Sequence, residues 1–211
     1  MLRLDLHVHT SHSYDGRSSV DEVVAAAKAK GLDGVAITDH NSVAGHLEAK
    51  KYSKSGFLVI PGIEVASADG HIVGLGISEL IPRGLSAKET VERIRGQGGI
   101  AIAAHPFALG RRPGVVYKAK FDAIEVLNSR AFFISNPLAR GFAERNKIPM
   151  VAGSDAHRME DIGLAYTTVD CELKIESVLR QIRAGKSFVS GRTLSFPSLL
   201  WRFVRKMASK K

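Results

Sequence analysis

The sequence predicts a single domain of the α/β class, and three observations support this prediction. Short apolar runs alternate with longer helical patterns along about 190 residues, as in a parallel sheet whose strands are joined by crossover helices. The 211 residues and the 45% share of hydrophobic side chains suit one domain with its own core. No linker, repeat or low-complexity segment divides the chain. A doubly wound open sheet and a closed barrel would both produce this pattern.

Eight apolar runs of four to seven residues are the expected strands, because a strand covered on both faces is almost continuously apolar. They cover residues 2–8, 34–38, 57–63, 71–77, 100–104, 123–127, 149–152 and 164–169. Their lengths and composition predict parallel strands. The run at 71–77 follows the previous one without a helix, so the alternation is interrupted there.

Two of the expected helices begin with a capping box, in which a serine is followed three residues later by a glutamate. Ser19 and Glu22 start one helix, and Ser86 and Glu89 start another. Weaker helical patterns cover residues 43–54, 137–146 and 175–184.

The end of the chain is basic and amphipathic. Apolar residues such as Leu199, Phe203 and Met207 alternate with arginines and lysines, which predicts a helix that docks on the barrel. We therefore expect one main domain at residues 1–195 and a basic C-terminal tail at residues 196–211. The formal net charge of +9 favours anionic partners such as phosphates or nucleic acid, and a solvated surface rich in lysine and arginine is the alternative explanation.

Several functional classes lack support in the sequence. The single cysteine, Cys171, cannot form a disulfide within the chain and has no histidine nearby, which argues against a thiol nucleophile. Neither a Gly-x-Ser-x-Gly elbow nor a Gly-x-x-x-x-Gly-Lys loop is present. The sequence also has no signal peptide and no apolar stretch of about 18 residues, so we expect a soluble, cytoplasmic protein without a membrane partner.

Side chains that bind metals or substrates follow six of the apolar runs, at the point where each run ends. They are His7 and His9, Asp39 and His40, Glu64, His105, Asn128, and Asp155 and His157. In a parallel barrel the carboxyl ends of the strands lie on one face, where the active sites of such barrels are built. Because residues i and i+2 of a strand point to the same side, His7 and His9 can bind one cation. Asp155 and His157 repeat this spacing.

This set of donors predicts a site for more than one metal ion. Imidazole and carboxylate groups suit zinc, manganese or iron, and one ion takes only about four to six ligands. The candidates exceed that number, and carboxylates can bridge neighbouring cations. Two ions about 3.5–4 Å apart can clamp a phosphorus centre during in-line displacement. We therefore expect two or three divalent ions, manganese, zinc or iron, and chemistry at phosphorus.

The sequence resembles the PHP (polymerase and histidinol phosphatase) superfamily in the motifs DLHVHTSHSYDG, AITDHN, PGIEVAS with GHIVGLGI, AAHPF, EVLNS and GSDAH. These motifs occur in the order of the family between residue 4 and about residue 165, and they most resemble those of the stand-alone phosphoesterases. The resemblance implies a distorted (β/α)7 TIM-like barrel with a trinuclear metal site. The implied metal ligands are His7, His9, Asp15, His40, Glu64, His71, His105, Asp155 and His157.

The resemblance also implies how these ligands divide among three metals. Glu64 bridges the first two. The first metal is completed by His7, His9 and Asp155, the second by His71 and His105, and the third is held by Asp15, His40 and His157.

Residues outside the ligand set have expected roles as well. The resemblance implies that Arg130 contacts phosphate, and we assign substrate binding to Arg130 and Asn128; a salt bridge within the protein is the alternative role for Arg130. Asp39 is expected to orient a ligand histidine. His12 and His46 match no ligand position. His46 is expected at the surface, and His12 at the surface or behind the ligands, with contact to the substrate as the alternative for His12.

The predicted function is metal-dependent hydrolysis of a phosphate ester, either a phosphomonoester or a small nucleotide-type phosphodiester. Asp155, His9 and Glu64 would act in catalysis through a metal-activated hydroxide. The expected substrate is a phosphorylated small molecule or a nucleotide. Two alternatives stay open: a nuclease that acts on nucleic acid ends, and a non-catalytic nucleic-acid-binding barrel.

Overall fold

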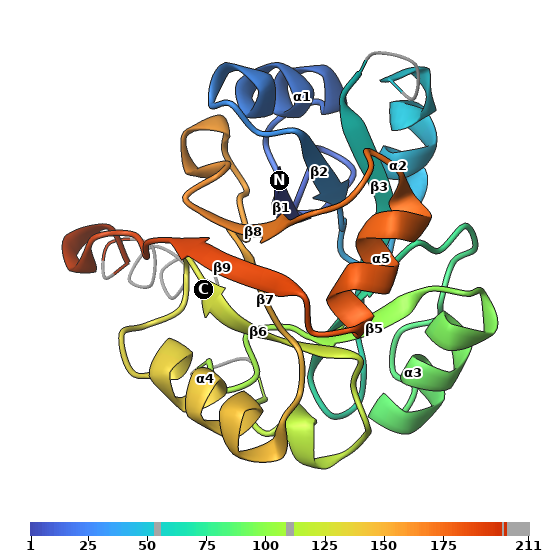
Figure 1. Ribbon diagram of the computed structural model, residues 1–211, viewed down its shortest axis with the longest axis vertical. Helices are drawn as coiled ribbons and strands as arrows, with labels where there is room; N and C mark the ends of the chain where they lie inside the picture. The colour runs from blue at the N-terminus through green and yellow to red at the C-terminus, as the bar shows by residue number, and fades with distance from the viewer. Residues whose placement is uncertain (53–55, 109–111, 200, 202–211) are drawn as a thin grey trace.

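The computed structural model describes residues 1–52, 56–108, 112–199 and 201, and these residues form one sheet of nine strands. The strands are β1 (Leu2–Val8), β2 (Gly34–Ile37), β3 (Leu58–Ala66), β4 (His71–Leu75), β5 (Ile100–Ala103), β6 (Ala123–Asn128), β7 (Met150–Gly153), β8 (Ala165–Val169) and β9 (Ser187–Gly191). Their order in the sheet is β7-β6-β5-β4-β3-β2-β1-β8-β9 (Figure 1).

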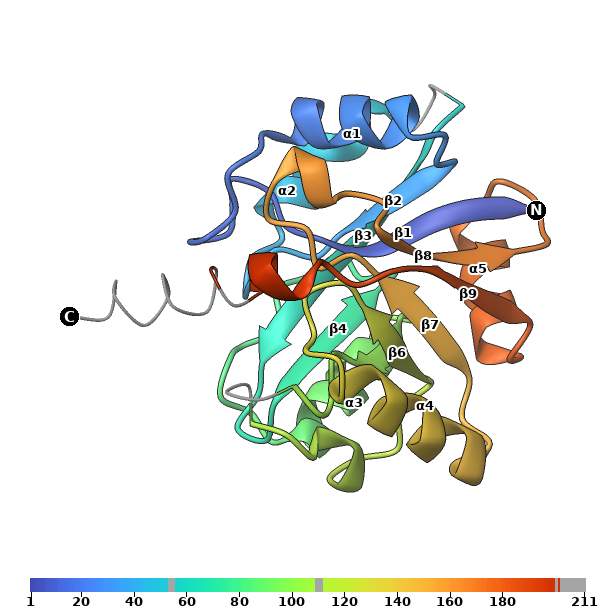
Figure 2. The same cartoon turned by 90° about the vertical axis from the view of Figure 1, so that its left-hand side faces the viewer.

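Strands β1 to β7 form a nearly closed barrel, because β7 returns to the side of β1. Where they meet, the N–H of His9 donates to the carbonyl of Ala156 at 2.9 Å, and the N–H of Ser154 donates to the carboxylate of Asp5 at 2.9 Å. The predicted distorted barrel is confirmed, and the open sheet is excluded. β1 runs from right to left in Figure 2, so the end of the barrel at the carboxyl end of β1, which we call the mouth, faces left there.

The strand directions correct one expectation. β1, β2 and β3 are parallel, as are β5, β6 and β7, but β4 is antiparallel to both of its neighbours and β8 is antiparallel to β1. The prediction of parallel strands at 71–77 and 164–169 was therefore wrong. A short turn joins β3 to β4, and such a connection permits only an antiparallel pair. β9 was not predicted, because its half-exposed residues Ser187–Gly191 do not form a continuous apolar run.

The helices are α1 (Val20–Ala29), α2 (Ala44–Glu48), α3 (Ala87–Gly96), α4 (Ser135–Asn146) and α5 (Ile175–Arg183). Both predicted capping boxes are present, because the Ser19 and Ser86 side chains each accept the N–H of the glutamate three residues later at 3.2 Å. Of the helix expected at 43–54, only α2 is α-helical; a 3-10 turn at Ala49–Tyr52 follows, and residues 53 and 54 lie outside the described residues.

Apolar side chains of the strands fill the interior of the barrel, among them Leu4, Ile60 and Ile100, which are fully buried. α5 covers the end of the barrel opposite to the mouth, where its Val178 and Ile182 pack on these side chains. Figure 1 views the molecule from this closed end, with α5 in front. The apolar core therefore lies below the mouth and supports it.

The segment after β9 returns to the carboxyl end of β6, where the N–H of Leu194 donates to the carbonyl of Ser129 at 2.7 Å. Residues 196–199 and 201 are helical, whereas residues 200 and 202–211 lie outside the described residues. The docking of the tail on the barrel therefore stays a prediction. Within the part of the chain that the structure describes, every helix is too short or too polar to cross a membrane.

Candidate metal centre

All nine predicted ligands gather at the mouth of the barrel, and they come from six separate segments. Most of them lie at or after the carboxyl end of a parallel strand. His71 is different, because it is the first residue of β4. Since β4 is antiparallel, with His71 paired to Ala66 at the carboxyl end of β3, its start lies at the same mouth. The spatial grouping that was expected from the motifs is thus present in the structure.

Glu64 lies at the centre of the cluster and is fully buried. Five histidines surround its carboxylate. Their ring nitrogens lie 2.7 Å (His71), 2.8 Å (His40), 2.9 Å (His105), 3.3 Å (His9) and 3.5 Å (His7) from a Glu64 oxygen. The Glu64 carboxylate therefore has imidazoles close to both of its oxygens.

Two aspartates complete the cluster on the side away from His71. Asp155 Oδ1 lies 3.3 Å from His9 Nε2 and 3.5 Å from His157 Nδ1. Asp15 contacts His157 Nε2 at 3.1 Å and His40 Nε2 at 3.6 Å. Donor atoms lie within 4.8 Å of one another in four groups: His9, His40 and His157; His7, His105 and Asp155; His7, His9 and Glu64; and His40, Glu64 and His71.

Several buried side-chain nitrogen and oxygen atoms that could bind a metal have no hydrogen-bond partner among the described residues. They are His7 Nε2, His9 Nε2, Asp15 Oδ1, Glu64 Oε2 and His157 Nε2. A buried polar atom without a partner lowers the stability of the fold by about 1–3 kcal/mol. Several such atoms at one point therefore indicate that a ligand normally satisfies them. A cation would satisfy them, and imidazole with carboxylate suits zinc, manganese or iron. The cluster is consistent with a multi-metal site.

The electrostatics of Glu64, Asp15 and His9 suit metal binding, whereas neighbouring carboxylates outweigh burial and raise the pKa of His7 and of His40. Burial raises the pKa of Glu64, but His40 and His71 outweigh this effect and hold the pKa well below its usual range. Burial likewise raises the pKa of Asp15, yet the close contact with His157 brings it down to about 2. Burial lowers the pKa of His9, and His157 lowers it further. At neutral pH these groups are in the ionised or neutral forms that coordinate metals.

Glu125 was not predicted as a site residue. It is buried inside β6, its carboxylate lies 2.9 Å from His7 Nδ1, and it accepts the N–H of His105 at 2.8 Å. Because a carboxylate only accepts, Nδ1 of His7 carries the proton and Nε2 faces Glu64 and Asp155. The sequence did contain a signal for this role: a glutamate within an apolar strand, since buried glutamates nearly always have partners.

His9 is oriented in a similar way by Ser13, which is held in turn by Asp39. Its Nδ1 lies 3.1 Å from Ser13 Oγ, which donates to Asp39 at 2.9 Å and accepts the N–H of His40 at 2.9 Å. Asp39 was expected to orient the adjacent histidine, but it acts through Ser13 instead. It also accepts the N–H of Thr10 at 2.7 Å, which holds the loop after β1.

The two histidines outside the ligand set have different environments. His12 pairs with Glu48 at 2.8 Å, and its side chain is one-third exposed, in agreement with the surface position expected for it. The expectation that His46 lies at the surface was wrong. α2 turns His46 toward β3, where it is buried and its Nδ1 lies 3.2 Å from the carbonyl of Gly62.

The two predicted substrate-binding residues lie beside Asp155. Arg130 Nη1 lies 3.3 Å from the Asp155 carbonyl and 3.7 Å from its Oδ1, and it contacts His157 Nδ1. Asn128 is buried, and its amide donates to Glu125 at 3.0 Å and to Asp155 at 3.4 Å. The Asn128 amide therefore holds carboxylates of the cluster, while contact of Arg130 and Asn128 with a substrate stays a prediction.

The backbone at the mouth is strained where it carries these side chains. Asn41, His105 and Asp155 have φ angles of 49°, 29° and 54°, in the left-handed region that glycine favours. Such conformations cost about 1–3 kcal/mol each and are concentrated at functional sites. Gly153 precedes Asp155 by two residues, and a Cβ there would overlap His7. The chain thus accepts local strain in order to direct these residues at one point.

Comparisons with known proteins agree with the resemblance seen in the motifs. The family model described as PHP domain matches residues 5–128, and the model described as PHP-associated matches residues 133–187. The uncharacterized protein MJ1587 of Methanocaldococcus jannaschii is 42% identical over 144 residues, 61% of this chain and 82% of that protein. The uncharacterized protein MJ0417 of the same organism is 34% identical over 188 residues, 83% of this chain and 73% of that protein.

Among solved structures, the fold is similar to that of a two-domain protein from Bacteroides vulgatus that contains a predicted PHP-like metal-dependent phosphoesterase. The TM-score is 0.74 and the sequence identity is 22%. The match covers 97% of this chain and 69% of that chain. At this identity the likeness concerns the fold.

Proposed function

Because the chain belongs to the PHP domain family, whose members are metal-dependent phosphoesterases, we propose that it hydrolyses phosphate esters at the metal centre. The substrate in this proposal is a phosphomonoester or a small nucleotide-type phosphodiester. The observation that supports it is the environment of Glu64. Five histidines and two aspartates meet there, and several of their buried donor atoms have no hydrogen-bond partner among the described residues.

The nine predicted ligands would hold two or three divalent ions, manganese, zinc or iron. When bound, such ions act as Lewis acids on phosphoryl oxygens and favour attack by water at neutral pH. Glu64 would bridge two of these ions, a role supported by the approach of His7 and His9 to its Oε2 and of His71 and His105 to its Oε1. Glu125 and Ser13 would hold His7 and His9 in the orientation that coordination needs.

Arg130 would bind the phosphoryl group. Its guanidinium reaches the edge of the cluster beside Asp155, and the side chain is 19% exposed, so one part is held by the protein while another reaches solvent. A guanidinium presents a planar pair of donors that matches two phosphoryl oxygens. It would also balance the negative charge that develops as the ester bond breaks. Asn128, buried behind it, would keep the Asp155 carboxylate in place.

Release of phosphate from a panel of monoesters, and of the alcohol or nucleotide product from a panel of diesters, tests the proposal. The full chain is treated with a chelator and then supplied with manganese, zinc or iron, and bound metal is measured alongside turnover. We expect two or three ions per chain, and turnover that the chelator abolishes and one of the metals restores. Turnover that persists after complete removal of metal would refute the proposal.

Matched variants separate the metal centre from the rest of the loop. His9→Ala and Asp155→Asn are expected to lose metal and activity. His12→Ala serves as the control, because His12 lies in the same loop as His9 but pairs with Glu48 at the surface. Equal loss of activity in the His12 and His9 variants would mean that the loop, and not the ligand, matters.

A further inference from the structure

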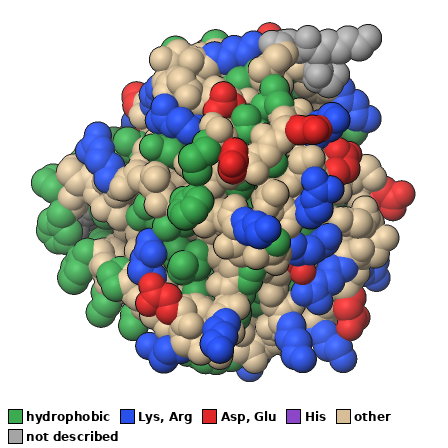
Figure 3. Space-filling view, in the orientation of Figure 1, with side chains coloured by type: hydrophobic (Ala, Val, Ile, Leu, Met, Phe, Trp, Pro, Cys, Tyr) green, Lys and Arg blue, Asp and Glu red, His purple; other side chains and the backbone are tan. Residues whose placement is uncertain are grey.

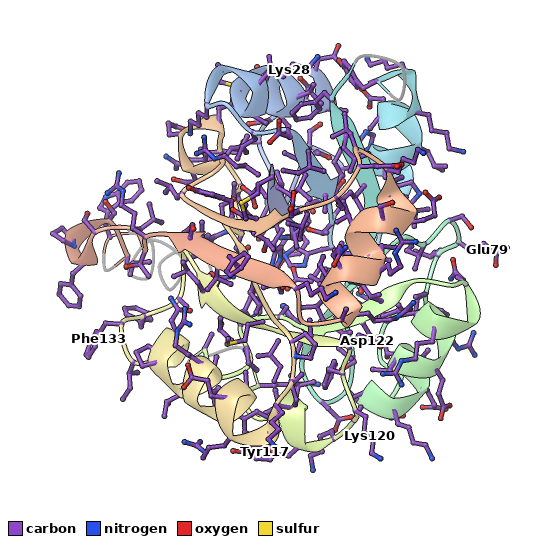
Figure 4. All side chains as sticks on the ribbon, viewed as in Figure 1. Lys28, Glu79, Tyr117, Lys120, Asp122 and Phe133 are labelled. Atoms are coloured by element: carbon purple, nitrogen blue, oxygen red, sulfur yellow. The ribbon has the colours of Figure 1, made fainter. Side chains whose placement is uncertain are left out.

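A groove of about 480 Å³ runs along the side of the barrel between α3 and the segment that follows the 3-10 turn Val115–Tyr117. Val91 and Ala119 form its apolar floor. Its polar and aromatic walls are Lys88, Glu92, Arg95, Tyr117, Lys118 and Lys120. Figure 4 labels Tyr117 and Lys120 along the lower edge of the molecule, between α4 and α3, and in Figure 3 lysine and arginine side chains gather over the same side of the molecule. The metal centre contributes no residue to this groove.

The charge of the groove is strongly positive, with four cations against one carboxylate. Arg95 has a structural role, because it pairs with Asp122 at 3.1 Å and donates to the carbonyl of Lys120 at 2.9 Å. The side chains of Lys88, Lys118 and Lys120 make no hydrogen bond or ion pair within the described part of the chain. Three ammonium groups are therefore available to an anionic partner.

Tyr117 adds an aromatic surface to the groove. Its side chain is 68% exposed. The ring is held from behind by edge contacts with Phe142 at 5.1 Å and Phe107 at 6.3 Å between ring centroids. An exposed ring in a fixed position, next to lysines, combines the two features that single-stranded nucleic acid requires: a face on which a base can stack and cations along the backbone.

One end of the groove lies toward the mouth end of the barrel, where α3 begins. The N–H at the start of α3, at Ala87, donates to the carboxylate of Asp69 at 2.7 Å, and Asp69 precedes His71 by two residues. On the other wall, Phe107 follows His105 by two residues and contacts Tyr117. From there the groove continues past Arg95 toward the amino end of β6. The end of the groove at Lys88 therefore lies at the same end of the barrel as His71 and His105.

We propose that this groove binds single-stranded nucleic acid, with phosphates against Lys88, Lys118 and Lys120 and a base on Tyr117. The binding goes beyond the proposed hydrolysis and needs no metal. A mononucleotide would use only a part of the groove. An acidic peptide would match the charges but would leave the ring of Tyr117 without a partner.

Fluorescence anisotropy of a labelled oligothymidylate tests the proposal on the full chain, with chelator present so that the probe is not hydrolysed. The triple variant Lys88→Ala, Lys118→Ala, Lys120→Ala is expected to bind at least about tenfold more weakly. The slope of log Kd against log salt concentration should be smaller for this variant than for the wild type by about 2, since each phosphate contact on a single strand contributes about 0.7 to the slope. Tyr117→Leu, which leaves the charge unchanged, is expected to weaken binding by roughly tenfold.

The matched control removes three lysines elsewhere, Lys50, Lys174 and Lys186, which are exposed and outside the groove. This variant has the same net charge as the groove variant and should bind within about twofold of the wild type. Equal weakening in the two triple variants would overturn the proposal, because net charge alone would then explain binding. An unchanged affinity in Tyr117→Leu would also overturn it.

Competitors identify the class of ligand. Unlabelled oligothymidylate should displace the probe at lower concentration than poly-glutamate or a mononucleotide, and equal displacement by either would overturn the proposal. Ester hydrolysis by the wild-type chain is measured in parallel. If hydrolysis is absent while binding depends on the groove, the proposed function fails and the groove stands. If hydrolysis is present while oligonucleotide binding is absent, the groove fails alone.

Discussion

The two ends of the barrel are built from the same strands, yet their buried side chains are of opposite kinds. At the mouth, Glu64 is fully buried among five histidines. At the closed end, Ile182 of α5 is equally buried but lies among apolar side chains such as Leu4 and Ile100. Burial alone therefore does not identify the functional end. The chemistry of what is buried does.

This difference has an energetic consequence. The closed end stabilises the fold, because each of its side chains removes apolar surface from water. The mouth does the opposite in the protein without cations, since donor atoms without hydrogen bonds and strained residues such as Asp155 each cost free energy. In barrels of this kind, stability comes from the amino ends of strands and function from the carboxyl ends. Substitutions at the two ends should therefore separate activity from stability.

The largest effect is expected for Glu64→Gln at the mouth. The amide keeps the shape of the side chain but replaces one carboxylate oxygen by a donor, which cannot bridge cations. We expect phosphate release to fall by at least about 1,000-fold, comparable to the loss of a main electrostatic contribution to catalysis. Turnover with added metal and the metal content of the purified variant are the measurements. Near-wild-type turnover would place the reacting groups elsewhere.

Ile182→Ala tests the closed end. The substitution leaves a cavity between α5 and the interior of the barrel, and we expect the free energy of unfolding to fall by about 2–5 kcal/mol. Urea denaturation of the metal-free chain measures it. Turnover of the folded protein and its metal content should stay at the wild-type level, because Ile182 contacts no residue of the cluster. A loss of metal in this variant would contradict the conclusion that the closed end contributes to stability and the mouth to function.

Much of the mouth could be predicted from the sequence. Ligand-type residues stand directly after apolar runs, and the i, i+2 spacings of His7 with His9 and of Asp155 with His157 put both members of each pair on one side. The capping boxes at Ser19 and Ser86 were likewise predictable, since each depends only on residues three apart. Local chemistry and local spacing determine these features.

Features that depend on distant partners were missed. An apolar run carries no sign of its direction, so the antiparallel β4 and β8 were taken for parallel strands, and the half-exposed β9 had no pattern to reveal it. Glu125 looks like an isolated charge in the sequence, because its partner His7 lies 118 residues away. His46 was placed at the surface because only the packing of α2 on β3 shows that its face is covered.

Glu125→Gln sharpens the comparison within the mouth by testing a residue behind the ligands. Burial lowers the pKa of His7, but Glu125 and Glu64 outweigh it and raise the pKa above its usual value, so metal binding at His7 must release a proton. An amide at position 125 would hold the His7 ring less firmly and would make its Nε2 a less basic metal ligand. We expect metal affinity to fall by about 10–100-fold, as measured by competition with a chromogenic chelator.

Glu176→Gln is the matched control for this prediction, because Glu176 is exposed on α5 at the closed end. Its metal affinity should equal that of the wild type. If Glu125→Gln also leaves the affinity unchanged, the orientation of His7 does not depend on Glu125, and contacts at Nε2 alone position the ring.

The smallest effect is expected for Ser19→Ala, which tests whether everything near the mouth serves the metal centre. Ser19 starts α1 directly after the loop that carries Asp15, and its side chain accepts the N–H of Glu22. Loss of this cap should lower the free energy of unfolding by about 1 kcal/mol, measured by urea denaturation, and leave turnover unchanged. Ser86→Ala should cost less, because the start of α3 has a second partner in Asp69. If turnover of Ser19→Ala falls together with its free energy of unfolding, the cap of α1 helps to position Asp15. Even this cap beside the mouth would then contribute to activity as well as to stability.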